Sequence, residues 1–419
     1  MLYTRRGAPL SLTPDVLSSM KHMPPAYGVD TIQFLAGPSP EVLAAHGQGG
    51  HNFLAIPKTM PLVASNRDPT MYEYGAKPST DQGTYVTIHT GAALVPPEKY
   101  MAIIAALQPD LYVALCDEIT HDAKPKKIEQ TIKRSAKWLD ACLNLHSSHS
   151  LEGVSGMLAP IGGGNSLKER SRAAKMVADK PVAGFALAGF ATGEAPGAER
   201  GALLSAAIEQ LPANKIRYMP GMLSPVDLLD CVAKGVDLFD GAFPVQVTSE
   251  GYALCFPLQP SQPPPAGQPD VESGVDETKI NLWAAAYRLD KSGLVPGCTC
   301  YACTRHSRAY VHHLLQTNEM LGEVLLEVHN THHFQAFLGA VRKAIESGTF
   351  AEYHTWFKER YLQQQQPEDL QDAGKSLAEA GKDLTRPVGS GGKRPTWTRS
   401  DGDDGKKEEK DQAKQQRTQ

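Results

Sequence analysis

The chain has 419 residues, of which 41% are hydrophobic and 21% charged, and its formal net charge is -4 at pH 7. This balance is ordinary for a soluble globular protein and excludes one that binds nucleic acid through bulk positive charge. No apolar run reaches the ~20 residues that span a bilayer, and the opening residues lack an apolar signal segment. We therefore expect a cytosolic protein with one large domain and additions to it.

The first residues predict a short strand, a turn and a helix that begins at Pro14, with Thr13 as its N-cap. Further along, short apolar runs alternate with amphipathic segments. The apolar runs, each interpreted as a strand, are 84–89, 111–116, 157–161, 182–187, 216–219 and 236–240. The intervening segments predict helices at about 97–107, 127–145, 167–178, 197–211 and 225–234.

This alternation predicts an α/β fold with a parallel sheet covered by helices. Six such units in series, with earlier strands available to complete eight, favour a (β/α)8 TIM barrel over a doubly wound sheet. Barrels place their sites at the C-terminal ends of the strands. The residues expected there are Asp117, Glu118, Gly162, Gly163, Gly164, Gly189, Glu194 and Asp240.

The barrel body is expected over 1–290, with a Pro/Gln-rich inserted loop at 257–269 and helical periodicity from 276 to 288. A further subdomain is expected over 291–362, with helices from about 304 onward. Beyond 363 the chain is polar and carries as many basic as acidic residues, which predicts a solvated, disordered tail over 363–419.

Three of the seven cysteines, Cys298, Cys300 and Cys303, lie within one short C-x-C-x2-C stretch. Thiolates with an imidazole are preferred ligands of tetrahedral zinc, and a Cys3His set closes the coordination sphere. The alternatives are a disulfide cluster or buried free thiols; scattered remaining cysteines and the lack of a secretory signal disfavour a disulfide framework. Spacing leaves the fourth ligand open among His306, His312, His313, His329, His332 and His333.

Several stretches together resemble the tRNA-guanine transglycosylase (queuine tRNA-ribosyltransferase) family, in register from about residue 2 to 360. The cysteine cluster fits the family's C-x-C-x2-C-x25-H pattern, which selects His329 as the fourth ligand. The other matching stretches are 111–118, 184–189 with the following Gly193 and Glu194, 211–219 and 235–240. The resemblance implies exchange of the wobble guanine of a tRNA anticodon through an aspartate nucleophile and a second aspartate as general acid/base. By position, Asp240 matches the nucleophile and Asp117 the aspartate that recognises the base.

The sequence also departs from the catalytic pattern. The family's Ser-Asp-Ser-Gly-Gly-Phe-Gln motif is replaced by Lys-Pro-Ser-Thr-Asp-Gln-Gly at 77–83, so Asp81 lacks its motif and the second carboxylate is missing. The family's Val-Gln-Gly-Gly is replaced by Ile-Gly-Gly-Gly at 161–164, which removes a base-reading amide. The family's Pro-Thr-Arg becomes Pro-Val-Gln at 244–246, without arginine. Together these losses are expected to abolish turnover.

These departures, with the opening Leu-Tyr-Thr-Arg, resemble the accessory, non-catalytic branch of the eukaryotic family. That resemblance implies no catalytic residue in this chain and one structural Zn2+ held by Cys298, Cys300, Cys303 and His329. It implies a heterodimer with a catalytic queuine tRNA-ribosyltransferase subunit, which this chain stabilises while helping to dock tRNAs for Asp, Asn, His and Tyr. It also implies a cytoplasmic location with peripheral association at the mitochondrial outer membrane.

Two alternatives remain open. One is a self-sufficient transglycosylase that uses Asp240 as its nucleophile, since that carboxylate and Asp117 are both retained. The other is an unrelated zinc-containing barrel hydrolase, against which the closed coordination sphere of a Cys3His site argues.

Overall fold

The structure is a computed structural model, and it describes residues 2–4, 12–18, 20, 24–31, 40–67, 77–88, 91–148, 154, 156–190, 197–221, 223–260 and 278–362. Most of the Pro/Gln-rich loop expected at 257–269, the strand-end residue Glu194 and the tail expected at 363–419 lie outside these residues. Within them, no helix is both long and apolar enough to cross a membrane.

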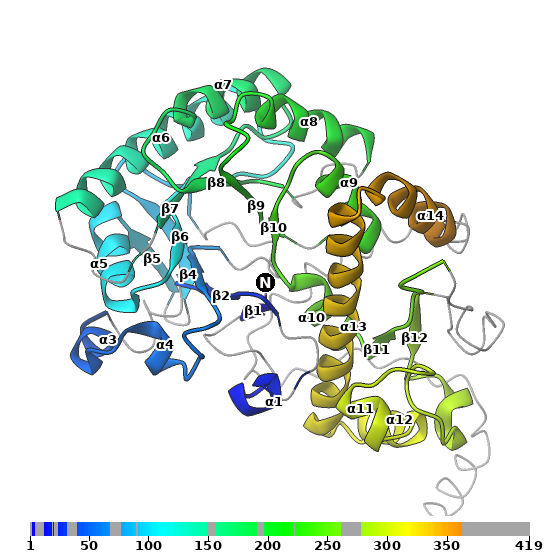
Figure 1. The fold of residues 1–419 in the computed structure, drawn as a ribbon. Helices are drawn as coiled ribbons and strands as arrows, with labels where there is room; N and C mark the ends of the chain where they lie inside the picture. The colour runs from blue at the N-terminus through cyan, green and yellow to red at the C-terminus, as the bar shows by residue number, and fades with distance from the viewer. Residues whose placement is uncertain are drawn as a thin grey trace, which may run out of the picture.

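An eight-stranded parallel sheet curls through the centre of the protein (Figure 1). Its strands pair in the order β1, β2, β3, β6, β7, β8, β9, β10, and every pairing is parallel. The predicted α/β class and parallel sheet are confirmed. Within the described residues, no pairing joins β1 to β10, the first and last strands of this sheet. The strands are Leu2–Thr4 (β1), Tyr27–Asp30 (β2), Leu62–Ser65 (β3), Leu111–Val113 (β6), Gly156–Ile161 (β7), Gly184–Leu187 (β8), Ile216–Met219 (β9) and Leu238–Phe239 (β10).

Helices follow the strands and pack around the outside of the sheet (Figure 1). Side-chain caps fix several of their starts: Ser166 accepts from the Glu169 amide and Ser224 from the Asp227 amide, as Thr13 does from the Val16 amide. Because each helix starts after its strand ends, helix N-termini and C-terminal strand ends share one edge of the sheet. The helices are Pro14–Ser18 (α1), Pro40–His46 (α3), Gly49–Phe53 (α4), Pro97–Leu107 (α5), Pro125–Ser148 (α6), Leu167–Val177 (α7), Ala198–Ile208 (α8), Pro225–Ala233 (α9) and Ala242–Ser249 (α10).

The strand predicted at 84–89 is not a strand of the central sheet. It forms β4 (Thr84–Ile88), which pairs antiparallel with β5 (Gly91–Val95) in a separate hairpin. The burial pattern gives the physical reason, because only Val86 of β4 is buried, whereas β7 and β8 are buried at every residue. A strand of a helix-covered parallel sheet is apolar on both faces. The sheet position before α5 is filled instead by β3.

The helical periodicity expected from 276 to 288 is wrong. The described part of this segment forms β12 (Lys279–Asn281), which pairs antiparallel with β11 (Tyr252–Leu254), and a 3-10 helix at Ala285–Leu289. The Asn281 side chain accepts a hydrogen bond from the Trp283 amide at 3.0 Å, which turns the chain directly after the strand. Pairing with β11 also buries Ile280. This tertiary contact, and not the helical spacing of the apolar residues, therefore decides the structure of the segment.

The helices expected from about 304 to 362 are confirmed as α11 (Tyr301–Arg305), α12 (Arg308–Gln316), α13 (Met320–Glu346) and α14 (Phe350–Leu362). The long helix α13 lies between the sheet and the α11–α12 pair (Figure 1). Its Leu325 and Leu326 belong to a hydrophobic cluster with Cys300 and Val311. Further along α13, Phe334 and Phe337 join the core of the sheet and its helices. One helix therefore contributes to both hydrophobic clusters.

Candidate metal centre and the site at the strand ends

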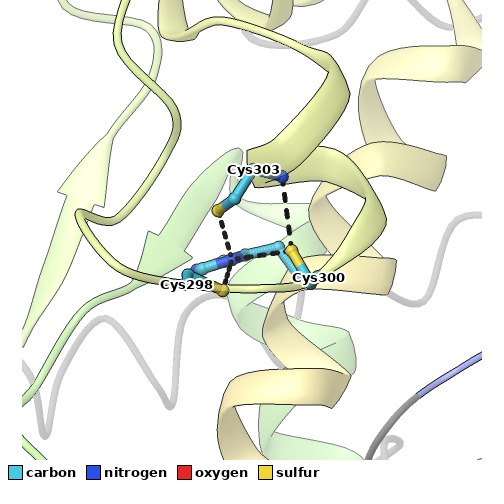
Figure 2. A group of neighbouring side chains, drawn as sticks. Cys298, Cys300 and Cys303 are labelled. Carbon is cyan, nitrogen blue, oxygen red and sulfur yellow. Dashed lines mark hydrogen bonds between the residues drawn. The ribbon is translucent and has the colours of Figure 1, made fainter.

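The structure brings together the side chains of Cys298, Cys300, Cys303 and His329. Their candidate ligand atoms all lie within 4.8 Å of one another. The sulfurs of Cys298, Cys300 and Cys303 lie 3.7, 3.5 and 3.3 Å from the His329 Nδ1 atom. Figure 2 shows the three labelled cysteine side chains gathered in one place.

These spacings fit a bound metal ion. A tetrahedron with metal–sulfur bonds of about 2.3 Å and a metal–nitrogen bond of about 2.0–2.1 Å has sulfur–nitrogen edges of about 3.5 Å. The three observed sulfur–nitrogen distances lie around that value. The cluster can therefore hold one metal ion.

Local structure positions the three sulfurs. Gly297 adopts a φ of +74°, a left-handed conformation that turns the chain into the cysteine stretch. Cys300 then occupies the N-cap position of α11, and its sulfur accepts a hydrogen bond from the Cys303 amide at 3.3 Å. The first turn of α11 thus brings Cys303 over Cys300, as Figure 2 shows.

The fourth residue, His329, is fully buried in the middle of α13. Its Nε2 atom lies 2.8 Å from the Leu254 carbonyl oxygen. Because a carbonyl only accepts, Nε2 carries a proton, and Nδ1 is the ring nitrogen that faces the sulfurs. Burial disfavours a charged imidazole here, yet the Cys298 and Cys303 sulfurs raise the pKa of His329 to about 10. A bound metal cation would attract these sulfurs as the charged imidazole does, and it would take the place of the proton on Nδ1.

Neighbours of His329 on α13 anchor the helix to the strand β11 and its continuation. Asn330 accepts from the Leu254 amide at 2.8 Å and donates to the Tyr252 carbonyl at 2.9 Å. His333 Nε2 lies 3.0 Å from the Phe256 carbonyl, and burial, reinforced by His329, lowers the pKa of His333 to about 3. His333 is therefore neutral and, like His312, whose Nδ1 contacts the Leu282 carbonyl at 2.8 Å, is engaged with backbone.

A second group of polar side chains lies at the C-terminal ends of the strands. Asp240 follows β10 and is buried, with its carboxylate accepting from the Gly221 amide at 2.7 Å and from the Ala242 amide at 3.0 Å. Burial raises the pKa of Asp240 to about 6, although these two amide hydrogen bonds oppose that shift. The carboxylate therefore joins the end of β9 to the start of α10.

The pKa of Asp240 predicts a pH-dependent stability difference. The folded protein retains this proton up to about pH 6, while the unfolded chain releases it near 3.8, so folding stability from this group falls as pH rises between these values. Asp240→Asn removes that loss, and its free energy of unfolding relative to the parent should rise by about 2 kcal/mol from pH 4 to pH 7. Paired urea denaturation at the two pH values measures the difference. A pH-independent difference would contradict the raised pKa.

Asp117 is buried and paired inside the protein. Its carboxylate forms an ion pair of 2.6 Å with Arg134 of α6, and both side chains are at least nine-tenths buried. Arg134 also contacts Asp81 at 3.2 Å, and Trp138 donates to the Asp81 carbonyl at 3.3 Å. The segment 77–83, which replaces the family's acid/base motif, thus packs on α6, and Arg134 neutralises the aspartate that matches the base-recognition position.

Glu118 is paired as well, with Arg67 at 2.8 Å. The same Arg67 donates to the Phe190 carbonyl at 3.2 Å, so it links the ends of β3, β6 and β8. Sequence reasoning placed Asp117 and Glu118 at the strand ends but missed Arg67 and Arg134, since neither belongs to a motif. The only signal was that two adjacent carboxylates at a buried strand end need compensating cations.

The glycine run that follows β7 is held by Arg170 of α7, which is 1% exposed. Its guanidinium donates to the carbonyls of Gly164, Ala188 and Gly189 at 2.9, 2.6 and 3.0 Å. It also lies 3.9 Å from the centroid of the Phe190 ring. These contacts of Arg170 fix the backbone of the connection between β7 and α7. Within this connection Gly163 and Gly164 adopt positive φ.

The profile of the queuine tRNA-ribosyltransferase family matches residues 1–363. The chain belongs to this family. Among curated relatives, the queuine tRNA-ribosyltransferase accessory subunit 2 of Homo sapiens is 34% identical over 377 residues, covering 84% of this chain and 90% of the relative. The proteins of the same name from Gallus gallus and Danio rerio are 34% and 33% identical, covering 82% and 84% of this chain and 86% and 89% of the relatives. The family resemblance of the sequence is confirmed.

Proposed function

We propose that this chain is the non-catalytic subunit of a heterodimeric queuine tRNA-ribosyltransferase. It supports exchange of the wobble guanine for queuine in tRNAs for Asp, Asn, His and Tyr by stabilising a catalytic subunit and helping to dock tRNA. The observation that carries this proposal is the state of the strand-end site. Asp240 is buried against the Gly221 and Ala242 amides, and Asp117 is paired with Arg134. Both carboxylates are engaged by groups of the protein itself, which supports a role without chemistry.

The accessory role rests further on the similarity to the proteins named accessory subunit 2, which spans most of both chains. We also infer that the curled sheet is the wall of a closed (β/α)8 barrel. Its eight parallel strands pair in chain order, interrupted only by the β4–β5 hairpin, and each is followed by helix. A closed barrel removes the exposed edges that β1 and β10 would otherwise present.

The metal in the Cys3His cluster is proposed to be one structural zinc ion. Three thiolates and an imidazole are the donors zinc prefers, and four protein ligands leave no position for a reactive water. The ion would join α11 to α13, and the family function gives it no chemical step here. Metal analysis by mass spectrometry of the protein purified without chelator tests its identity.

The partner is proposed to bind on the metal-bearing subdomain. Tyr301 and Tyr310 are 58% and 39% exposed, and His306 lies between them with ring centroids at 5.6 and 5.3 Å. Exposed aromatic side chains that already pack on one another lose little conformational freedom on binding and are enriched at protein interfaces. A cytoplasmic location with peripheral association at the mitochondrial outer membrane is proposed from the family resemblance alone.

The deciding experiment is incorporation of labelled guanine or queuine into tRNA. The purified chain is assayed alone and then mixed with a catalytic subunit. We expect no exchange by the isolated chain and exchange by the mixture. Exchange by the isolated chain would support the alternative, a self-sufficient transglycosylase with Asp240 as nucleophile.

Asp240→Asn separates these two functions within the heterodimer. Because the chemistry is assigned to the partner, kcat for base exchange should stay within about twofold of the parent. The matched substitution of the partner's nucleophilic aspartate provides the control, and it should reduce kcat by several orders of magnitude. A large drop in kcat for Asp240→Asn, with the heterodimer intact by size-exclusion chromatography, would show that this chain performs chemistry.

A further inference from the structure

A cationic surface covers the outward faces of two neighbouring helices, α6 and α7, which follow one another around the sheet (Figure 1). On α6, Lys126, Lys133 and Lys137 recur at helical spacing opposite the buried face. On α7 the equivalent outward positions are Lys168, Arg172 and Lys175. Lys124 and Lys127 add to the start of α6. We call these residues the α6–α7 basic surface.

Most of these cations have no hydrogen-bond or ion-pair partner among the residues that the structure describes. Lys133 pairs with Glu129 at 2.7 Å and Arg172 with Glu169 at 3.0 Å. Within the described part of the chain, the lysines of the surface that form no ion pair or hydrogen bond through their side chains are Lys124, Lys126, Lys127, Lys137, Lys168 and Lys175. This excess of positive charge stands on a chain whose formal net charge is -4.

The positive charges converge across the two helices. The Lys133 hydrogen bond and charge lower the pKa of Glu129 on α6, and Arg172 and Lys168 on α7 lower it further. The outer faces of the two helices thus form one electrostatic surface. Two acids among these cations, Glu129 and Glu169, are each paired with one of them, and Asp140 further along α6 is paired with Lys180.

The start of α6 is electrostatically unfavourable in the isolated chain. Its first turn contains Lys126 and Lys127 and no acidic residue, and Lys124 stands just before Pro125, where a side-chain acceptor would normally cap the helix. The partial positive charge of a helix N-terminus favours anions and disfavours lysine. A bound polyanion would relieve both the repulsion among the lysines and their repulsion by the helix end.

We propose that the α6–α7 basic surface binds the phosphodiester backbone of RNA, as a tRNA contact contributed by this chain. The inference rests on the proposed function, and it adds the surface through which the accessory chain docks tRNA. The N-termini of α6 and α7 lie at the same edge of the sheet as the strand-end carboxylates Asp117 and Asp240. Phosphate contacts position a nucleic acid without recognising its sequence, and the lysines of the α6–α7 basic surface can make contacts of this kind.

A lipid surface of the same charge is less well matched. Membrane-surface helices combine lysines with a continuous apolar face. The exposed large apolar side chains of α7, Leu167 and Met176, lie far apart along the helix, and none is recorded on α6 among the described residues. Phosphates of RNA are therefore the favoured occupant, and phospholipid binding is one outcome of the test.

The test uses the full chain carrying Lys126→Glu, Lys127→Glu and Lys168→Glu. The control carries Lys58→Glu, Lys99→Glu and Lys343→Glu, which make the same change in net charge at exposed positions elsewhere, with Lys99 also in the first turn of a helix. Affinity for an unmodified tRNA is measured by fluorescence anisotropy over a salt series, for the chain alone and for the heterodimer. Thermal unfolding and size-exclusion chromatography establish that both variants fold and assemble.

We expect the surface variant to bind tRNA about tenfold more weakly, with the slope of log affinity against log salt reduced by about 2–3 for three lost phosphate contacts. In the heterodimer KM for tRNA should rise while kcat at saturating tRNA stays unchanged. The control should match the parent. The melting temperature of the surface variant should not fall, because glutamate at the start of α6 favours the helix end.

Equal affinity and salt slope for the surface variant, the control and the parent would overturn the inference. So would unchanged tRNA binding combined with lost binding to vesicles of phosphatidylcholine and phosphatidylserine, which would assign the surface to lipid. Failure of the proposed function has a different signature. In that case the mixture with a catalytic subunit shows no gain in base exchange, whatever the lysine variants do to tRNA affinity.

Discussion

Cys300→Ser should remove the metal ion and unfold the segment that carries it. Cys300 contributes a ligand and caps α11, and serine replaces its thiolate with a poor donor for zinc. Because binding energy at a structural metal site is also folding energy, the metal content should fall from about one ion per chain to near zero. Loss of the α11–α12 segment should in turn abolish heterodimer formation, measured by size-exclusion chromatography with a catalytic subunit.

Cys142→Ser is the matched control, since Cys142 is equally buried but lies on α6, away from the cluster. It should retain the metal and the heterodimer at a modest cost in stability. Full metal occupancy in Cys300→Ser together with an intact heterodimer would show that the cluster is not a metal site. Hydrogen exchange would locate the damage, with protection lost first in α11 and α12.

Arg170→Met should destabilise the central sheet and its helices by about 3 kcal/mol. The substitution keeps much of the side-chain length but removes the donors to four carbonyls, at Ile161, Gly164, Ala188 and Gly189. Leaving a buried acceptor unpaired costs about 1–3 kcal/mol, partly recovered where water reaches it. The cation–π contact with Phe190 is lost as well. Urea denaturation measures the change in the free energy of unfolding.

Arg172→Met, two residues away on the same helix, is the comparison. Arg172 pairs with Glu169 at the surface, with 36% of its side chain exposed, so its removal should cost less than about 1 kcal/mol. Arg170→Lys should fall between the two, because it keeps the charge and loses the planar fork. Similar stabilities for Arg170→Met and Arg172→Met would mean that the glycine connection does not depend on Arg170.

The sequence could predict those parts of the fold and the site that depend on the periodicity of apolar residues within one segment or on the spacing of residues within one motif. The helix at Pro97–Leu107 was predicted at its observed bounds, because a proline at the first turn and a continuous apolar face are local signals. The cysteine triplet was visible by spacing, and only the family pattern selected His329 from several histidines. The segment at 84–88 was correctly predicted as a strand but was placed in the wrong sheet, because strand propensity does not specify which sheet a strand joins. Its partial burial is typical of a hairpin.

The ion pairs of the strand-end site could not be predicted in the same way. Arg134 meets Asp117 from the next helix, and Arg67 meets Glu118 across 51 positions of sequence. Neither arginine has a local pattern that distinguishes it from a surface cation. The sequence showed that base-reading and acid/base groups were missing, whereas the structure shows what holds the remaining carboxylates.

The sharing of α13 between the two hydrophobic clusters has a consequence for how the protein unfolds. His329 and Asn330 sit in the middle of this 27-residue helix, where they bind the β11 backbone, and Phe334 and Phe337 one to two turns later enter the main core. A helix that is continuous through both clusters cannot lose order at one end without weakening the other. Loss of the metal, which unfolds the α11–α12 segment, is therefore expected to weaken β11 pairing and core packing as well. Withdrawal of the metal by a chelator should accordingly also lower the melting temperature of the main core.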